Sequence, residues 1–234
     1  VFEERCNRGI KGKPCAFWRA ALFLILVCNN NDYEKLLRNQ AFNFENCEGL
    51  HMTHCEAEGG LTDGTHTGHM GFRFLNCQAI WLERCMADTL DSHAFVFQDT
   101  NYVYMTACTA ALCCGHGIAI LGTTSRHYMI TNCYIQGRYP YSPAPASAHG
   151  IYNYNNMVTV SNCIIGNMTG HAIANNSQGQ NTIYNGINTN FCQSSFYSSA
   201  GIGIVTNLIS AISGDSPTWG AFNHTDNLIN GVFG

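Results

Sequence analysis

The chain has 234 residues, enough to bury a substantial core in one or two domains. Charged residues make up only 11% of it, and 11 Lys and Arg stand against 15 Asp and Glu, so the net formal charge is −4. This composition lacks the basic surface that nucleic-acid binding normally needs. Most of the polar surface must come from Asn, Ser, Thr, Gln and Gly, which suits sugars as ligands and also occurs in inert structural proteins.

The longest apolar run, AALFLILVC at residues 20–28, is about half the length of a membrane-spanning helix. We interpret it as a buried strand and expect no membrane insertion. Basic residues precede it, but no small-residue cleavage site follows, as a signal peptide would require. Residues 1–40 are therefore predicted to form an N-terminal cap, in which DYEKLLR at residues 32–38 is a short helix covering the end of the fold.

From residue 41 onward a short phrase recurs: a histidine, then Gly or Ala, then Ile or Phe. It stands at His93, His116, His149 and His171, with variant forms at Gln40 and His69. If Ala41, Gly71, Ala94, Gly117, Gly150 and Ala172 begin the repeats, the steps are 30, 23, 23, 33 and 22 residues. Within each repeat, apolar residues alternate with polar ones between turn residues, which indicates short strands rather than helices.

A cysteine recurs at a nearly constant distance from the start of each repeat. The distance is 14 residues for Cys55, Cys85 and Cys108, 16 for Cys133 and 13 for Cys163. The residues three before and two after each cysteine are apolar in every repeat. Asn132 and Asn162 precede the last two cysteines, and we expect Asn185 to continue their column. The fold class predicted is all-β: a parallel β-helix solenoid with about 22–23 residues per coil, whose strands stack about 4.8 Å apart.

The solenoid is predicted to cover residues 41–190, and looser repeats such as GIGIV at residues 201–205 predict further irregular coils over residues 191–234. The 13 cysteines are odd in number and fall at a repeating position. This pattern favours buried thiols in a chain that folds in a reducing compartment over a framework of disulfides.

The segments VSNCIIG and ITNCYIQG, with an asparagine at the bend and a small thiol inside, resemble the internal ladders of the right-handed parallel β-helix of the pectin-lyase-like superfamily. Within it, the low charge and the many cysteines are most similar to phage tailspikes and tail fibres. The resemblance implies a virion attachment protein that binds bacterial surface polysaccharide and can also depolymerise it, acting outside the cell as a homotrimer after folding in the host cytoplasm. Independently of the resemblance, we expect no cofactor, no metal and no nucleic-acid partner.

Two alternatives stay open, because a fold does not fix a function. One is a free polysaccharide hydrolase, lyase or epimerase of the same fold. The other is a purely structural β-helix of a larger assembly.

Two insertions, at residues 59–70 and 137–148, fall in the same turn after the cysteine strand, three coil steps apart. At the strand spacing these loops stand about 14 Å apart. They predict a groove over the coils of residues 71–116, or else contacts to neighbouring subunits.

Acidic residues collect beside this groove. Alternation from the cysteines sends Glu56, Glu58 and Asp88 outward, and Glu58 and Asp88 occupy equivalent positions in adjacent coils. Two carboxyls about 5 Å apart suit the acid and the nucleophile of a retaining glycosidase, whereas a more distant partner such as Asp91 or Asp63 suits an inverting one. The alternative is that they are solvated turn acids.

The predicted substrate-binding residues are Glu56, Arg73, Arg84, Tyr139 and Tyr141, of which the two tyrosines lie on the second insertion. Strand tyrosines such as Tyr102 and Tyr104 are interpreted as residues at the edge of the core.

The recurring histidines are interpreted as a structural stack at the corner of the coil. The ligands of a metal ion converge on one point, whereas the side chains of a ladder lie one above another. Only His66 and His69 with Asp63 form a convergent set.

Overall fold

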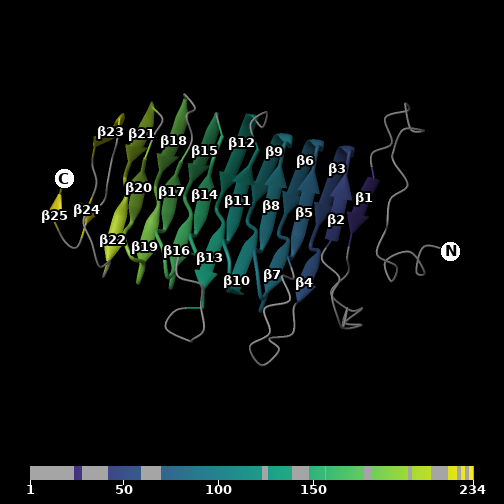
Figure 1. Cartoon of the computed structure of the whole chain (residues 1–234), viewed down its shortest axis with the longest axis horizontal. Helices are drawn as coiled ribbons and strands as arrows, with labels where there is room; N and C mark the ends of the chain where they lie inside the picture. Colours follow the sequence, from purple (N-terminus) through teal and green to yellow (C-terminus); the bar gives the residue numbers. More distant parts are fainter. Residues whose placement is uncertain are drawn as a thin grey trace.

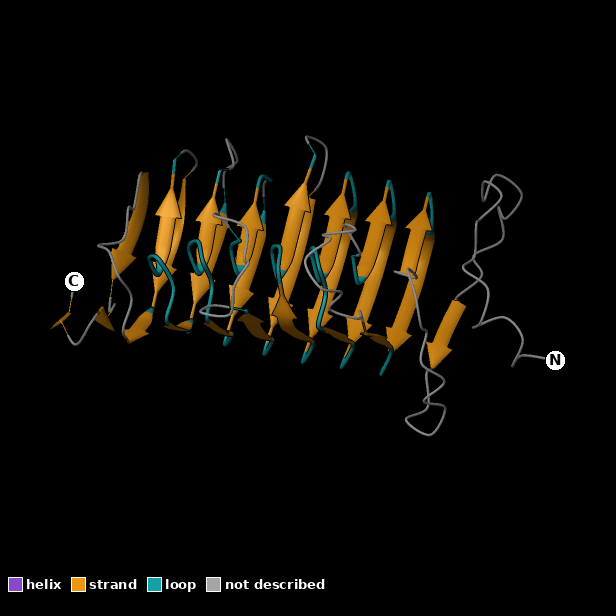
Figure 2. Ribbon diagram, turned by 60° about the horizontal axis from the view of Figure 1, so that its bottom comes forward, coloured by secondary structure: helices purple, strands orange, loops and turns teal. Residues whose placement is uncertain are grey.

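The computed structural model describes residues 24–27, 42–58, 70–122, 126–138, 148–155, 157–176, 181–199, 202–211, 221–225, 228–229 and 232–233. All regular elements within these ranges are strands, which stack in rows along the long axis (Figures 1 and 2). The short helix expected at residues 32–38 lies outside the described residues. No helix of the described part is long and apolar enough to cross a membrane.

The strands form three sheets, named A, B and C here. Sheet A contains β1 (Leu24–Val27), β3 (Glu48–Thr53), β6 (Gln78–Glu83), β9 (Asn101–Thr106), β12 (Arg126–Thr131), β15 (Val158–Ser161), β18 (Thr182–Asn185), β21 (Ile202–Thr206) and β23 (Ala221–Thr225). Sheet B contains β2 (Phe42–Glu45), β5 (Phe72–Leu75), β8 (Phe95–Gln98), β11 (Ile118–Leu121), β14 (Ile151–Asn153), β17 (Ile173–Asn175) and β20 (Phe196–Ser198). Sheet C contains β4 (Glu56–Glu58), β7 (Met86–Asp88), β10 (Thr109–Cys113), β13 (Tyr134–Gly137), β16 (Ile164–Gly166), β19 (Asn188–Asn190), β22 (Ile209–Ala211), β24 (Leu228–Ile229) and β25 (Val232–Phe233).

Each coil passes from sheet B to sheet A to sheet C and then returns to sheet B one step further along the axis. Strands in equivalent positions pair in parallel, and among the described pairs only β24 and β25 are antiparallel. The molecule is thus a right-handed parallel β-helix, and the predicted fold class is confirmed. Strands after residue 190 continue the same three sheets, and β1, within the apolar run of residues 20–28, pairs with β3.

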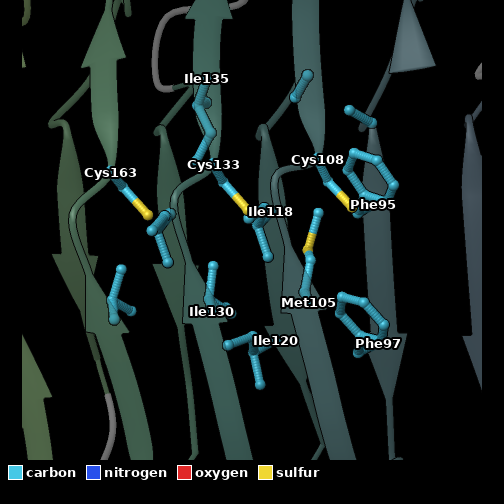
Figure 3. Packing of buried hydrophobic residues seen from close by; sticks show 14 of the residues in the cluster. Phe95, Phe97, Met105, Cys108, Ile118, Ile120, Ile130, Cys133, Ile135 and Cys163 are labelled. Carbon is cyan, nitrogen blue, oxygen red and sulfur yellow. The ribbon is translucent and has the colours of Figure 1, made fainter. Parts of the chain in front are cut away.

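The interior is built from files of like side chains, because in-register parallel strands place equivalent residues one above another. Sheet B carries the phenylalanine file Phe42, Phe72 and Phe95, with ring centroids 4.8 and 5.0 Å apart. The next inward position adds Phe44, Phe74 and Phe97 at 5.3 and 5.2 Å. Figure 3 shows these rings giving way to Ile118 and Ile120 in the following coil.

The predicted cysteine column is confirmed. All five thiols are buried at the corner between sheets A and C, and Figure 3 shows the sulfurs of Cys108, Cys133 and Cys163 pointing the same way. Each thiol donates to the carbonyl oxygen two residues earlier, at 3.3–3.7 Å. A small side chain fits here because the chain turns within two residues.

The residue before each cysteine adopts a left-handed backbone, with φ of 54° at Asn132 and 52° at Asn162. Asparagine tolerates this region better than most residues. The expectation that Asn185 continues their column is wrong by one position: Asn185 pairs with Ser161 on the strand, and Gly186, with φ of 64°, occupies the turn. Glycine adopts this backbone without steric cost. The turn is therefore kept in this coil, although its residue is Gly instead of Asn.

No disulfide joins the cysteines of the described part of the chain. Burial raises the pKa of the Cys113 thiol to about 12 and that of Cys192 to about 11. A thiol with a raised pKa is a poor nucleophile, because the thiolate is the reactive form. These thiols therefore behave as small apolar side chains of the core.

The Gly or Ala of the repeated phrase is fixed by packing. A Cβ on Gly117 would lie 2.3 Å from Cγ2 of Ile135, and one on Gly150 would lie 2.2 Å from Cγ2 of Ile165. In the coil that starts at Ala94, the equivalent sheet C residue is Ala110. At Gly117 and Gly150 the bulky isoleucine of sheet C therefore requires glycine. Gly71 is crowded in another way: although its sheet C neighbour is the small Ala87, a Cβ there would lie 2.5 Å from the carbonyl oxygen of Ala94.

The core changes character along the axis. In sheet B the file of Phe44, Phe74 and Phe97 continues in later coils. Its next members are Ile120, Asn153, Asn175 and Ser198. These three polar residues are almost fully buried. They are hydrogen-bonded, since Nδ2 of Asn153 donates to Oδ1 of Asn175 at 2.7 Å and to the hydroxyl of Tyr184 at 3.2 Å. Buried polar groups need such partners to avoid a desolvation cost.

Candidate functional site

Three carboxylates stand together on sheet C in the first two described coils. Glu58 of β4 pairs with Asp88 of β7, and Glu56 pairs with Met86. The expectation that Glu58 and Asp88 are neighbours on adjacent coils is therefore confirmed. Glu58 is exposed, whereas Glu56 and Asp88 are half-buried, and all three lie opposite the inward-facing Ala57 and Ala87.

The environment of Glu56 opposes the ionisation of its carboxyl. Burial, and then the charges of Glu58 and Asp88, raise the pKa of Glu56. Like charges held close together have this effect because ionising one makes ionising the next more costly. Oδ1 of Asp88 is buried and has no hydrogen-bond partner among the described residues. The cluster thus offers an acceptor oxygen and a carboxyl that holds its proton to higher pH than usual.

The third predicted acid is placed differently. Asp91 lies in the corner between β7 and β8 and is 8% exposed. Its carboxylate is therefore not presented on the outer face of sheet C as that of Glu58 is.

The two predicted arginines lie in other parts of the coil. Arg73 points outward between the buried Phe72 and Phe74, as expected, but on sheet B. Its guanidinium donates to Oδ1 of Asn43 at 3.1 Å and to Oε1 of Glu45 at 3.3 Å. These two partners belong to the neighbouring strand of sheet B and not to the carboxylates of sheet C.

Arg84 lies in the turn between β6 and β7, where sheets A and C meet. Its side chain is 60% exposed, with Nε 3.8 Å from the Glu83 carboxylate. An exposed pair of this kind contributes little to stability, so the guanidinium remains able to contact a ligand. The structure does not describe residues 59–69 and 139–147, which make up most of the two insertions. The predicted walls of the groove therefore lie outside the described residues, as do Tyr139, Tyr141, Asp63, His66 and His69.

Sequence reasoning missed an aromatic surface on the outer face of sheet A. Trp81 of β6 stacks on Tyr104 of β9 with ring centroids 5.7 Å apart and planes 8° from parallel. Beside them Tyr102 stacks on His127 at 4.9 Å. Tyr102 and Tyr104 are 41% and 38% exposed, so their interpretation as core-edge residues is wrong. The signal was present, since Trp81 and Tyr104 each follow an inward-facing residue.

The histidine column forms the predicted structural stack. His93, His116, His149 and His171 stack successively with centroids 4.7, 5.1 and 5.2 Å apart. Nδ1 of each of the first three accepts the backbone N–H of the next histidine at 2.8–3.0 Å. Burial, and then the neighbouring imidazoles, lower the pKa of His116 to about 3.

The rings of His93, His116 and His149 are held neutral, because an Nδ1 that accepts a hydrogen bond carries no proton. Among the described residues, no three His, Cys, Asp or Glu side chains are grouped so as to hold a metal ion.

Fold and surface together define a right-handed parallel β-helix whose first described coils present carboxylates on sheet C and aromatic rings on the adjoining sheet A. No model of a known protein family matches the chain, and the comparisons with curated proteins and with solved structures found no match either. The chemistry of this surface is therefore the basis for a functional proposal.

Proposed function

We propose that this protein is a glycan-binding β-helix of the tailspike type, which binds bacterial surface polysaccharide on the outer surface of its first coils. The observation that carries the proposal is that carboxylates and exposed aromatic rings lie on adjoining faces of the same coils. Trp81 and Arg84 precede Asp88 on one coil, and Tyr104 stands beside Trp81 on the next.

These residue types are those that recognise sugars. Aromatic rings offer apolar surface to the C–H faces of a sugar ring, while carboxylates and guanidinium groups exchange hydrogen bonds with its hydroxyls. The Trp81 and Tyr104 rings stack on one another, and His51 and Met129 are their next neighbours in the same outward file, so the outward edges of the two rings remain for a ligand. A polysaccharide is itself a repeating chain, which suits a surface that repeats along the axis.

Hydrolysis of the bound glycan is the catalytic part of the proposal. Glu58 and Asp88 are paired on adjacent strands about 5 Å apart, the separation used by retaining glycosidases. The raised pKa of Glu56 makes it a third candidate, because a general acid must stay protonated close to the working pH. The bond broken would be the glycosidic C–O bond, with water as the final acceptor of the glycosyl group.

The wider setting belongs to the same proposal. The protein would act at the surface of a virion as a homotrimer, after folding in a host cytoplasm. The reduced, buried thiols support folding in a reducing compartment.

The test of binding uses the intact chain on an array of bacterial polysaccharides, followed by titration of the best ligand. We expect Trp81→Ala and Tyr104→Ala each to weaken binding about tenfold or more, which corresponds to about 1.4 kcal/mol. Tyr154→Ala is the matched control, because Tyr154 is 44% exposed but lies outside this surface. If no glycan binds, or if all three variants bind as the wild type does, the proposal is wrong.

Catalysis is tested separately by release of reducing ends from the bound polysaccharide. We expect Glu58→Gln and Asp88→Asn to abolish release while binding is retained, and Glu45→Gln on sheet B to leave release unchanged. Unaltered release in both site variants would remove the catalytic assignment. Glycan binding without any release would leave an attachment protein that is not a hydrolase.

A further inference from the structure

The later coils of the β-helix carry a different outer surface. On sheet C, one outward file runs from Tyr134 through Ile164 and Asn188 to Ile209. Its apolar members are 41%, 50% and 46% exposed. Large aliphatic side chains that are half in water at regular intervals on a sheet face are typical of a surface that another molecule covers.

Sheet A repeats this pattern on the adjoining face. Met129, Thr159, Ile183 and Ile204 form one outward file in register. Met129, Ile183 and Ile204 are 47%, 39% and 44% exposed. The two files belong to the same coils, because β12, β15, β18 and β21 lead into β13, β16, β19 and β22 through short turns.

Charge is absent from the coils that follow Arg138 up to residue 214, and these coils carry all members of the two files except Met129 and Tyr134. Residues 139–214 contain no Asp, Glu, Lys or Arg, and all 11 Lys and Arg stand at or before Arg138. The other outward positions of the described strands here are uncharged, among them Ser161, Asn185, Asn190 and Thr206. A solvated surface normally carries charged residues, so their absence over three consecutive coils needs a reason.

We infer that copies of this chain associate side by side through the two aliphatic files, the sheet A file and the sheet C file. Identical subunits present identical charges to one another, and a surface without charge meets its own copy without repulsion. Burying the exposed isoleucines supplies the driving force. Because the files lie on two adjoining faces, each copy has a surface for each of two neighbours, as a closed ring requires.

A glycan fits these files less well than a second copy does. Isoleucine has no flat aromatic face for a sugar ring and no hydrogen-bonding group for its hydroxyls. A partner protein of opposite charge is also disfavoured, because no charge here would attract it. The inference rests on the proposed function only for the number of copies, three, and it uses none of the glycan-binding residues.

The experiment measures the mass of the intact chain in solution by light scattering and sedimentation, from low to high micromolar concentration. The wild type is expected at three times the 25.7 kDa of the chain. Ile164→Glu and Ile183→Glu, one on each file, are expected to raise the dissociation constant at least about 100-fold and give monomers. Gln98→Glu is the charge-matched control on sheet B and should assemble as the wild type does.

Circular dichroism of each variant separates dissociation from unfolding. If a glutamate variant does not fold, Ile164→Thr and Ile183→Thr replace it, because threonine suits an exposed strand position.

A monomeric wild type at high micromolar concentration, or folded variants that assemble as the wild type does, would overturn the inference. So would a monomer that binds a neutral glycan through Ile164. Assembly without glycan binding would support this inference and refute the proposed function. Glycan binding by a chain that stays monomeric would support glycan binding and refute this inference.

Discussion

The coils before residue 122 and those after residue 150 share one backbone plan but differ in both core and surface. The early coils are filled with stacked phenylalanines and present charged and aromatic side chains outside. The later coils bury Asn153, Asn175 and Ser198 and, up to residue 214, present isoleucines without any charged residue. A solenoid can vary in this way because each coil contacts only its neighbours, so its content changes step by step.

The difference also concerns how each half tolerates substitution. When a stacked aromatic ring is replaced by a smaller side chain, the free energy of unfolding falls with the volume removed, because the surrounding strands cannot close the cavity. A hydrogen-bonded polar file is sensitive instead to the loss of single partners.

The largest effect is expected from Phe97→Ala in the early core. The Phe97 ring stacks on Phe74 at 5.2 Å and meets the edge of Tyr128 at 5.8 Å. We expect a loss of about 3–5 kcal/mol in the free energy of unfolding. Ser198→Ala, in the same file at its polar end, should cost about 1 kcal/mol or less. Urea unfolding measures both, and equal losses would contradict the contrast between the two halves.

A smaller effect is expected from Asn175→Ile in the later core. This change removes the acceptor of the Tyr184 hydroxyl and one acceptor of Asn153 Nδ2. We expect a cost of about 1–3 kcal/mol, because the Tyr184 hydroxyl is fully buried. Adding Tyr184→Phe should recover part of the loss, since the hydroxyl that loses its Asn175 acceptor is then gone. Strict additivity in this double-mutant cycle would show that the hydrogen bonds do not couple the two residues.

The histidine stack runs through both halves and predicts a dependence of stability on pH. Burial, and then neighbouring imidazoles, lower the pKa of His116 to about 3 and that of His149 to about 4, against about 6.5 in an unfolded chain. The unfolded chain therefore binds protons first as the pH falls. The stability that the neutral rings contribute is complete above pH ~6.5 and is lost between that pH and about 3–4.

This effect is measured by urea unfolding between pH 7.5 and pH 4. Glu56 acts with the opposite sign: its raised pKa makes the folded state bind a proton first, so the measurement uses a Glu56→Gln background. Adding His116→Asn and His149→Asn should flatten the dependence. An unchanged slope would mean that other groups cause it.

The repetition made much of this fold predictable from sequence. Alternation around Cys108 or Cys133 assigns each residue to one side of a strand, and in-register stacking makes Glu58 and Asp88 neighbours although 30 residues separate them. The same reasoning placed Arg73 outward between two buried rings. It failed at Asn185, because Gly186 occupies the turn position that Asn162 holds one coil earlier, and an asparagine stands instead at the last position of the strand.

The surfaces were less predictable than the register. Alternation predicts that Tyr104 points outward. It does not predict whether another part of the chain covers the ring, so the stacked pair with Trp81 was missed. It also gave no sign that Asn153 and Asn175 are buried, because their partner Tyr184 comes from sheet A, across the interior.

The sequence by itself determined the coil, its length and the inward files, since these follow from a short repeat and the period of a strand. Only the tertiary structure decided which outward side chains meet, and hence where the carboxylates, the aromatic rings and the aliphatic files gather. The physical reason is that register along the axis is a local property of each strand pair. The way three sheets close around one core and share their corners is a property of the whole chain.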